Sequence, residues 1–368
     1  MVGPAKPKAL PDRLRGLAQR LAESDLPDLW QFQQTHFGAT SRQADPVFFA
    51  WRFGRHPLLA AAPDRQMPFW LSRRDGRVVG EQAGLPMLLQ DGERSVGAAW
   101  AIDLMVEPEW RLRGIAPALG KALADSVPLL CGLNISDAAH KAFRRAGWLD
   151  LGCVARMARL IRPLVAGQAP FGSQIASPAQ ALVSRWVSPL LSAGDAMILP
   201  ALRAGSRWEP IEAFDERVDA VWRRSAPHYP LLARRDFSLL RWRFDLAPHA
   251  AAYHRHYLTR RGEPVGYAVT RMRGHSLVVV DYLCAPQDVV ALFAHILTDA
   301  RRCGAVLLVC LAQPPAIRHR LRALGFIRKS GPRFMVHPGP DLPELPGLSD
   351  PAAWFLTDGD SDLDHGRA

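Results

Sequence analysis

The sequence predicts an α/β protein of two tandem domains, each built on a twisted mixed β-sheet flanked by helices. Its 368 residues are 48% hydrophobic and 22% charged, which is globular composition and enough chain for two domains. Apolar, strand-like segments alternate with helix-like segments, which indicates a layered sheet with at least one parallel pair of strands. The third observation is that the pattern of the first half recurs in the second half.

The repeat consists of matched blocks that follow one another in the same order in both halves. The matched residues are Asp45, Trp51, Arg52, Phe53, Pro57, Asp103, Pro108, Gly147 and Trp148 in the first half, and Asp236, Trp242, Arg243, Phe244, Pro248, Asp281, Pro286, Gly325 and Phe326 in the second. Residues 70–80 also resemble residues 257–266. Four blocks in one order predict a duplication. We interpret the shared Trp-Arg-Phe segments as core anchors rather than as a platform that stacks sugars.

Each half is predicted to contain the same helices and strands in the same order. A polar amphipathic entry leads into the aromatic helical segment, and two strands joined by a turn follow it. A long apolar strand comes next (residues 98–106 and 276–284), then a helix (115–126 and 289–303) and another strand (127–135 and 305–312). A short helix ends at Gly147 or Gly325, since glycine commonly follows the last helical residue, and a last strand closes each half.

The predicted domain boundaries follow changes in composition. The N-terminal domain covers residues 1–160, a linker with a helix over 180–191 covers 161–207, and the C-terminal domain covers 208–338. Residues 339–368 form a proline-rich and then acidic tail, which we expect to be solvated apart from Trp354-Phe355-Leu356. No stretch reaches the roughly 18 apolar residues that cross a bilayer, and the N-terminus has no apolar core, so we expect a cytoplasmic protein without a membrane span.

The cysteines and the acidic residues predict no metal site. The five cysteines form no C-x-x-C pair and have no histidines at zinc-ligand spacing. The acidic run at 358–364 lacks the spacing of a calcium-binding loop. The net charge of +11, from 46 basic and 35 acidic residues, favours ligands that carry phosphate. A nucleotide, a nucleic acid or an anionic lipid would each meet that condition, so charge alone does not choose among them.

The most informative segment is DLMVEPEWRLRGIAPAL, residues 103–119. A strand ends at Val106, and the following turn leads into a helix whose first N–H groups need partners. Gly114 and Ala116 are small enough to let a ligand approach the backbone. Arg111, Arg113 and the helix dipole favour negative charge at this place. The segment therefore predicts a pyrophosphate-binding turn.

This turn resembles the acetyl-CoA-binding signature of the GNAT N-acetyltransferase superfamily. The chain reads V-x-P-x-x-R-x-R-G-I-A, and Arg111, Gly114 and Ala116 fill the three fixed positions of the signature. A second stretch, from Asn134 to Gly147-Trp148, resembles the later strand and helix of that superfamily. The resemblance covers residues 29–157 and, more faintly, 208–336.

The resemblance implies an N-acyltransferase that uses acetyl-CoA or another acyl-CoA. In that superfamily the sheet splays between its fourth and fifth strands, the pantetheine arm lies in the gap, and the pyrophosphate rests on amides at the following helix. The cosubstrate-binding residues implied by position are Leu104, Val106, Arg111, Leu112, Arg113, Gly114, Ile115, Ala116, Asn134 and Phe143. The acceptor implied is a small-molecule amine that attacks the thioester directly, and similar two-copy proteins point to an amino sugar or a cell-envelope precursor.

Three residues are candidates for the general base of such a reaction: Asp103, Glu107 and His140. Asp103 lies beside the implied path of the thioester. It recurs as Asp281 in the second half, which favours a structural or substrate-orienting role. The tyrosine that many members of the superfamily use to protonate the leaving thiolate falls at Phe143, which has no hydroxyl.

The second half lacks the phosphate-binding turn. Its matching positions are Val289, Ala291, Leu292 and Ala294, so we expect it not to bind coenzyme A and instead to build part of the acceptor site or a pseudo-dimer. A homodimer is the other assembly expected. Two alternative functions stay open: a non-catalytic acyl-CoA sensor or assembly protein, and an aminoacyl-tRNA-dependent transferase of the peptidoglycan type. The intact turn in the first half argues against tRNA as the partner.

Overall fold

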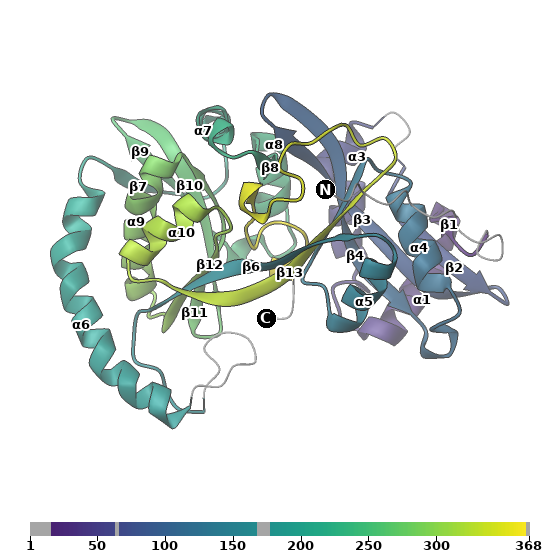
Figure 1. Cartoon of the computed structure of the whole chain (residues 1–368), viewed down its shortest axis with the longest axis horizontal. Helices are drawn as coiled ribbons and strands as arrows, with labels where there is room; N and C mark the ends of the chain where they lie inside the picture. Colours follow the sequence, from purple (N-terminus) through teal and green to yellow (C-terminus); the bar gives the residue numbers. More distant parts are fainter. Residues whose placement is uncertain (1–15, 63–65, 168–176, 366–368) are drawn as a thin grey trace. The chain divides into compact units, whose positions relative to one another are not determined.

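The computed structural model describes residues 16–62, 66–167 and 177–365, which form two compact units (Figure 1). Unit 1 contains the described residues up to Gly152 together with 246–248 and 333–349. Unit 2 contains the described residues of 153–245, residues 249–332 and the described residues from Asp350 on. In the described parts of the chain, no helix has the length and apolar character needed to cross a membrane.

Unit 1 is a mixed sheet with helices packed against it. Its elements are β1 (Gln19–Arg20), α1 (Leu26–Phe37), α2 (Pro46–Phe49), the π-helical turn η3 (Ala50–Gly54), α3 (Pro57–Ala60), β2 (Phe69–Arg74), β3 (Arg77–Asp91), β4 (Arg94–Val106), the 3₁₀ turn η4 (Pro108–Trp110), α4 (Ile115–Ala124), β5 (Leu129–Leu133) and α5 (Asp137–Arg145). Strands β1 to β4 pair antiparallel in order, and β4 pairs parallel with β5. Ile115 and Leu119 of α4 pack on Val79 and Val106, which fixes α4 on β3 and β4.

Unit 2 repeats the central order of unit 1, from a short helix and a π-helical turn through three antiparallel strands, a 3₁₀ turn, a helix, a strand and a helix. Its elements, of which β6 and β13 extend into unit 1, begin before that order and continue after it. They are β6 (Leu149–Leu160), α6 (Pro178–Arg203), β7 (Arg207–Ile211), α7 (Arg217–Ser225), β8 (Leu231–Ala233), α8 (Phe237–Leu240), the π-helical turn η6 (Arg241–Asp245), β9 (His254–Arg260), β10 (Glu263–Arg273), β11 (Ser276–Cys284), η8 (Pro286–Asp288), α9 (Val289–Arg302), β12 (Leu307–Leu311), α10 (Pro315–Ala323), β13 (Ile327–Pro338) and β14 (Trp354–Phe355). Its sheet runs in the order β7, β9, β10, β11, β12, β6, and β11 and β12 are parallel.

The last strand of each half differs from the domain division predicted from the sequence. Residues 156–160 of β6 pair with β12, so the end of the first half completes the sheet of unit 2. Residues 334–338 of β13 pair with β5, so the end of the second half completes the sheet of unit 1. In both places the added strand is antiparallel and satisfies the backbone groups of an edge that would otherwise be unpaired.

The two units share the register of their central strands as well as the order of the elements around them. Gly80 pairs with Val106 in unit 1, and Gly266 pairs with Cys284 in unit 2. The Trp-Arg-Phe segments form π-helical turns in both, which are rare outside functional or strained places. All six of these Trp, Arg and Phe side chains are buried. They therefore act as core anchors and offer no exposed platform for a sugar.

The linker holds a longer helix than the sequence predicted. Helix α6 runs over 26 residues, from Pro178 to Arg203, whereas the prediction covered 180–191. The side chain of Ser177 caps its first turn. Prolines at 189 and 200 lie inside the helix without ending it. Buried Asp195 holds the helix to the rest of unit 2 through Arg159 at 2.7 Å.

The acidic tail is buried, which corrects the prediction that it is solvated. Residues 353–358, as well as Asp360, Ser361 and Asp364, are buried. β14 pairs parallel with β8, which brings Trp354 and Phe355 into the core of unit 2. The carboxylates are tolerated there because buried arginines face them, an arrangement described below.

Candidate active site

The sheet of unit 1 opens between β4 and β5. The two strands pair only at Ala98–Leu129, Ala99–Leu130 and Trp100–Cys131. β4 continues to Val106, and its other edge stays paired with β3 as far as Gly80–Val106. The end of β4 therefore has a strand on one side only, at the position where the resemblance implies a splay.

A β-bulge lies in the unpaired stretch of β4. The pairing passes from Ala83–Ile102 to Glu81–Met105, so Asp103 and Leu104 together face one residue of β3. Asp103 has a φ of 52°, a left-handed conformation that is uncommon for a residue with a side chain. Bulges of this kind re-aim a side chain. Here the carboxylate of Asp103 turns to Arg52, whose Nη2 lies 2.6 Å away.

The turn after β4 leads into the N-terminus of α4. Gly114 occupies the N-cap position with a φ of 86°, which a residue with a side chain would adopt only under strain, and no side chain caps the helix. Leu112 is fully exposed with a φ of 62°. The guanidinium of Arg111 donates to the carbonyl of Val106 at 3.1 Å, and that of Arg113 lies 4.9 Å from the centre of the Trp110 ring. The first N–H groups of α4 thus have no side-chain cap, while the guanidinium of Arg111 contacts the end of β4 and that of Arg113 contacts Trp110.

Three carboxylates belong to the ends of β3 and β4: Glu81, Asp103 and Glu107. Each has a partner from the helical segments that precede the sheet in the chain. Gln33 of α1 donates to both oxygens of Glu81, at 3.1 and 3.3 Å. His36, one turn further along α1, places Nε2 3.4 Å from Glu107. Asp103 accepts from Gln43 at 3.2 Å in addition to Arg52.

Glu81 is the carboxyl group of this set with the most unusual environment. Its side chain is fully buried, and burial raises its pKa well above 4.5, with a further rise caused by the negative charge of Asp103. The hydrogen bond from Gln33 and the charge of Arg52 lower the pKa only in part. A carboxyl group in such surroundings exchanges a proton closer to neutral pH than an exposed one. Sequence reasoning missed Glu81.

The remaining sequence-predicted residues lie in other surroundings. His140 places Nε2 2.6 Å from Asp150 and 3.1 Å from Arg333, and it has no recorded contact with the carboxylates around Asp103. Phe143 stacks on Trp148, with ring centres 4.4 Å apart, and packs on the core. Asn134 is exposed with a φ of 63°, and its backbone N–H donates to Arg333. Val106 and Ile115 are buried, whereas Leu104 and Ala116 are half-buried.

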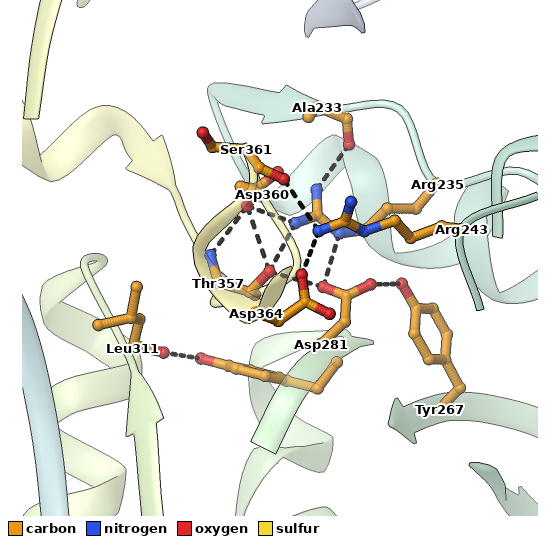
Figure 2. Close-up of polar contacts among 11 residues, drawn as sticks. Ala233, Arg235, Arg243, Tyr267, Asp281, Leu311, Thr357, Asp360, Ser361 and Asp364 are labelled. Atoms are coloured by element: carbon orange, nitrogen blue, oxygen red, sulfur yellow. Dashed lines mark hydrogen bonds and ion pairs between the residues drawn. The ribbon is translucent and has the colours of Figure 1, made fainter. Parts of the chain in front are cut away.

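In unit 2 the corresponding positions are filled by a closed polar network (Figure 2). Tyr267 takes the register position of Glu81, and its hydroxyl donates to Asp281 at 2.7 Å. Asp281 also accepts from Nε of Arg235 at 3.1 Å and from the hydroxyl of Thr357 at 2.8 Å. Asp360 pairs with Arg235 at 2.7 Å. All five side chains are buried.

The buried tail lies directly against β11, where unit 1 has the open edge of β4. The N–H of Gly359 donates to the carbonyl of Val280 at 2.6 Å. A Cβ at Gly359 would come within 3.1 Å of Cβ of Asp281 and 3.3 Å of the Phe244 ring, so the close approach requires glycine. Further along the tail, Asp364 pairs with Arg243 and accepts from the Tyr253 hydroxyl. Two basic side chains thus offset two tail carboxylates, which explains why an acidic segment is buried.

The N-terminus of α9 differs from that of α4 in charge. Its N-cap residue is Asp288, a buried carboxylate that pairs with Arg260 at 3.0 Å and with Arg224 at 3.4 Å. Val289 and Leu292 are buried in the core. This helix start presents an anion and no glycine turn, which disfavours a phosphate ligand. In the described ranges, no three His, Cys, Asp or Glu side chains gather as they would around a metal ion.

Comparison with known proteins places this chain by its fold. No protein-family model and no curated protein sequence matches it. Similar solved structures include GCN5-related N-acetyltransferases from Anabaena variabilis (15% identity, TM-score 0.57, 87% of this chain and 72% of that one) and Kribbella flavida (16%, 0.56, 87% and 70%). A conserved protein of unknown function from Enterococcus faecalis, described as a probable N-acyltransferase, is also similar (10%, 0.58, 87% and 71%).

Proposed function

This chain has the fold of the GCN5-related N-acetyltransferases, and on that premise we propose that unit 1 is an acyl-CoA-dependent N-acyltransferase. Acetyl-CoA or another acyl-CoA is the acyl donor, and a small-molecule amine is the acceptor. The observation that carries the proposal is the open edge of β4, which ends next to an N-terminus of α4 that has no side-chain cap. The structural similarity supports the fold at identities of only 10 to 16%, and the reaction is what the experiments below test.

The open edge and the uncapped helix fit the two polar parts of an acyl-CoA. β4 residues from Ala101 to Val106 have no β5 partner, so their outward N–H and C=O groups are suited to the amides of a pantetheine arm. The N–H groups of Ile115 and Ala116 are suited to a pyrophosphate, and Arg113 adds positive charge. Pro117 has no N–H and contributes none.

For the chemical step we assign the general base to Glu81 rather than to Asp103. The amine nitrogen attacks the thioester carbonyl, loses a proton to Glu81, and the C–S bond breaks to release coenzyme A thiolate. Burial and the negative charge of Asp103 raise the pKa of Glu81, and a carboxylate with a raised pKa is a stronger base than an ordinary one. Asp103, held by Arg52 and Gln43, acts as a positioning residue that raises the pKa of Glu81.

Unit 2 takes no acyl-CoA in this proposal. Gly359 of the tail is hydrogen-bonded to β11 where the acyl donor would lie, and Asp288 would repel a pyrophosphate at α9. One acyl-CoA is therefore expected for each chain.

The direct test is calorimetric titration of the full chain with acetyl-CoA. We expect saturable binding at about one site per chain. The Gly114→Trp variant should bind at least about a hundredfold more weakly. Its indole would cover the helix N-terminus, and its backbone could not keep a φ of 86° at low cost. Gly274→Trp is the matched control, because Gly274 also has positive φ and has open space around it. Absence of binding by acetyl-CoA and by longer acyl-CoAs would rule the proposal out.

Asp103→Asn tests the link between the two carboxyl groups. The change removes a negative charge that raises the pKa of Glu81 and leaves the opposing charge of Arg52, so that pKa should fall. A base is active when deprotonated, so the acidic limb of the kcat/KM profile should move to lower pH, by about one unit. The measurement is the pH profile of thiol release from acetyl-CoA with an acceptor found by screening. Loss of the limb together with most of the activity would assign the base to Asp103 itself, and a shift to higher pH would contradict the coupling between the two groups.

A further inference from the structure

Helix α6 carries its polar and apolar residues in the reverse of the usual arrangement. Its buried face, toward unit 2, contains Ser184, Ser188 and Asp195. Ser184 accepts from the N–H of Leu164 at 2.8 Å, Ser188 donates to the carbonyl of Ile161 at 3.1 Å, and Asp195 pairs with Arg159. Polar contacts therefore hold much of this helix to its unit, beside buried Ala181 and Leu199, and most of its large apolar residues lie on the other face.

The outward face of α6 is an exposed apolar stripe. It is formed by Leu182, Val183, Trp186, Leu190, Met197 and Ile198. These side chains are between 55% exposed, for Ile198, and 81% exposed, for Met197. At about 1.5 Å per residue the stripe is about 25 Å long. Folded proteins rarely leave so long a row of large apolar side chains in water unless something covers it.

The charged residues of α6 other than Asp195 are basic. They are exposed Arg185 and half-buried Arg203, whose guanidinium donates to the carbonyl of Leu199. Exposed Arg162, whose guanidinium donates to the carbonyl of Arg301, lies in the segment that is hydrogen-bonded to α6 through Ile161 and Leu164. Asp195 is the sole acidic residue of the helix, and it is buried and paired. An apolar row that contains a tryptophan, flanked by arginines, is the pattern of a helix that lies in the surface of an anionic bilayer.

A second copy of the chain would fit this surface less well. Two α6 helices packed parallel would bring Arg185 beside Arg185 and Arg203 beside Arg203, and packed antiparallel they would bring no exposed acid of α6 beside either arginine. No exposed acid of α6 is present to offset those charges. Anionic lipid headgroups would offset them.

We propose that the apolar face of α6 docks this protein on the surface of an anionic lipid bilayer. The helix lies in the plane of the headgroups, with Trp186 and Leu190 at the level of the acyl chains and Arg162, Arg185 and Arg203 facing lipid phosphates. The inference rests on unit 2 alone and does not depend on the acyltransferase activity proposed for unit 1.

The test is flotation of the full chain with vesicles made of equal parts of phosphatidylglycerol and phosphatidylcholine, beside vesicles of phosphatidylcholine alone. We expect the protein to float with the anionic vesicles and to dissociate partly from them when the salt concentration is raised. A Trp186→Ser, Leu190→Ser double variant should bind at least about tenfold more weakly, because both side chains leave the bilayer. These positions are exposed, so the variant should keep its melting temperature.

A matched double variant, Val47→Ser with Ile327→Ser, removes two exposed apolar side chains away from α6 and should bind as the parent does. An Arg162→Gln, Arg185→Gln variant should lose most of the preference for anionic over neutral vesicles. Equal flotation of the parent and the α6 variant would overturn the proposal. The proposal would also fail if the parent did not float but sedimented as a dimer, and the Trp186→Ser, Leu190→Ser variant sedimented as a monomer. The apolar face of α6 would then contact a second copy of the chain.

Discussion

Replacing Glu81 by glutamine is expected to lower kcat by about two to four orders of magnitude, the usual contribution of a general base. Glutamine keeps the size of the side chain and can still hydrogen-bond to Gln33, but it cannot take up a proton. The measurement is thiol release from acetyl-CoA in the presence of an acceptor amine, over a range of pH. The acidic limb of the profile should disappear, because no group with that pKa remains.

The same substitution should leave the fold intact or make it more stable. The pKa of Glu81 is raised in the folded state, so its contribution to stability is present below the pKa of the unfolded chain and is lost as pH rises through the folded-state pKa. Above that pH, Glu81→Gln removes the cost of a buried charge, and the melting temperature should not fall. Exposed Glu93→Gln serves as the control and should change neither quantity. If Glu81→Gln retained the parent kcat, Glu81 would not be the base.

Replacing Asp281 by alanine is expected to lower the free energy of unfolding by about 3–5 kcal/mol, the range found when one partner of a buried ion pair is removed. The change would leave Arg235 buried with Asp360 as its remaining charged partner, and would take an acceptor from Tyr267 and Thr357. Urea unfolding at neutral pH measures the loss. In a unit of this size the melting temperature should fall by about 6–20 °C.

The control for this prediction is an ion pair that is open to water. Arg217 and Glu209 are 3.0 Å apart, but their side chains are 41% and 40% exposed. Glu209→Ala should therefore cost less than about 1 kcal/mol, as exposed pairs do. A loss at Asp281→Ala no larger than this one would mean that the buried network contributes little to holding the tail on unit 2.

Local signals in the sequence predicted the strand, turn and helix around Gly114 well, and phosphate binding there stays a prediction. The strand before Val106, the glycine at 114 and the helix from Ile115 are neighbours in the chain, and each has a composition typical of its conformation. The shared Asp45 and Asp236 were also informative, because each caps the short helix that follows it. The duplication itself stays a prediction, which the common register of the two sheets supports.

Glu81 had no local signal that marked it. It follows Gly80 in an ordinary strand pattern, and its character comes from burial beneath Gln33, a residue of α1 48 positions earlier in the chain. The tail was misread for the same reason. Its aspartates predict a solvated segment until Arg235, Arg243 and Arg156 are seen to face them, and these arginines lie more than a hundred residues away.

The exchange of the last strands has a consequence for any attempt to divide this protein. A fragment that ends in the linker keeps the segment that pairs with β12 and lacks the one that pairs with β5. Expressed alone, each half would present a bare strand edge, and such edges lead to aggregation. Loss of the second half in evolution would likewise leave the first with an unfinished sheet. The second half would thus be retained even if it bound no substrate, because the first half cannot complete its sheet without residues 334–338.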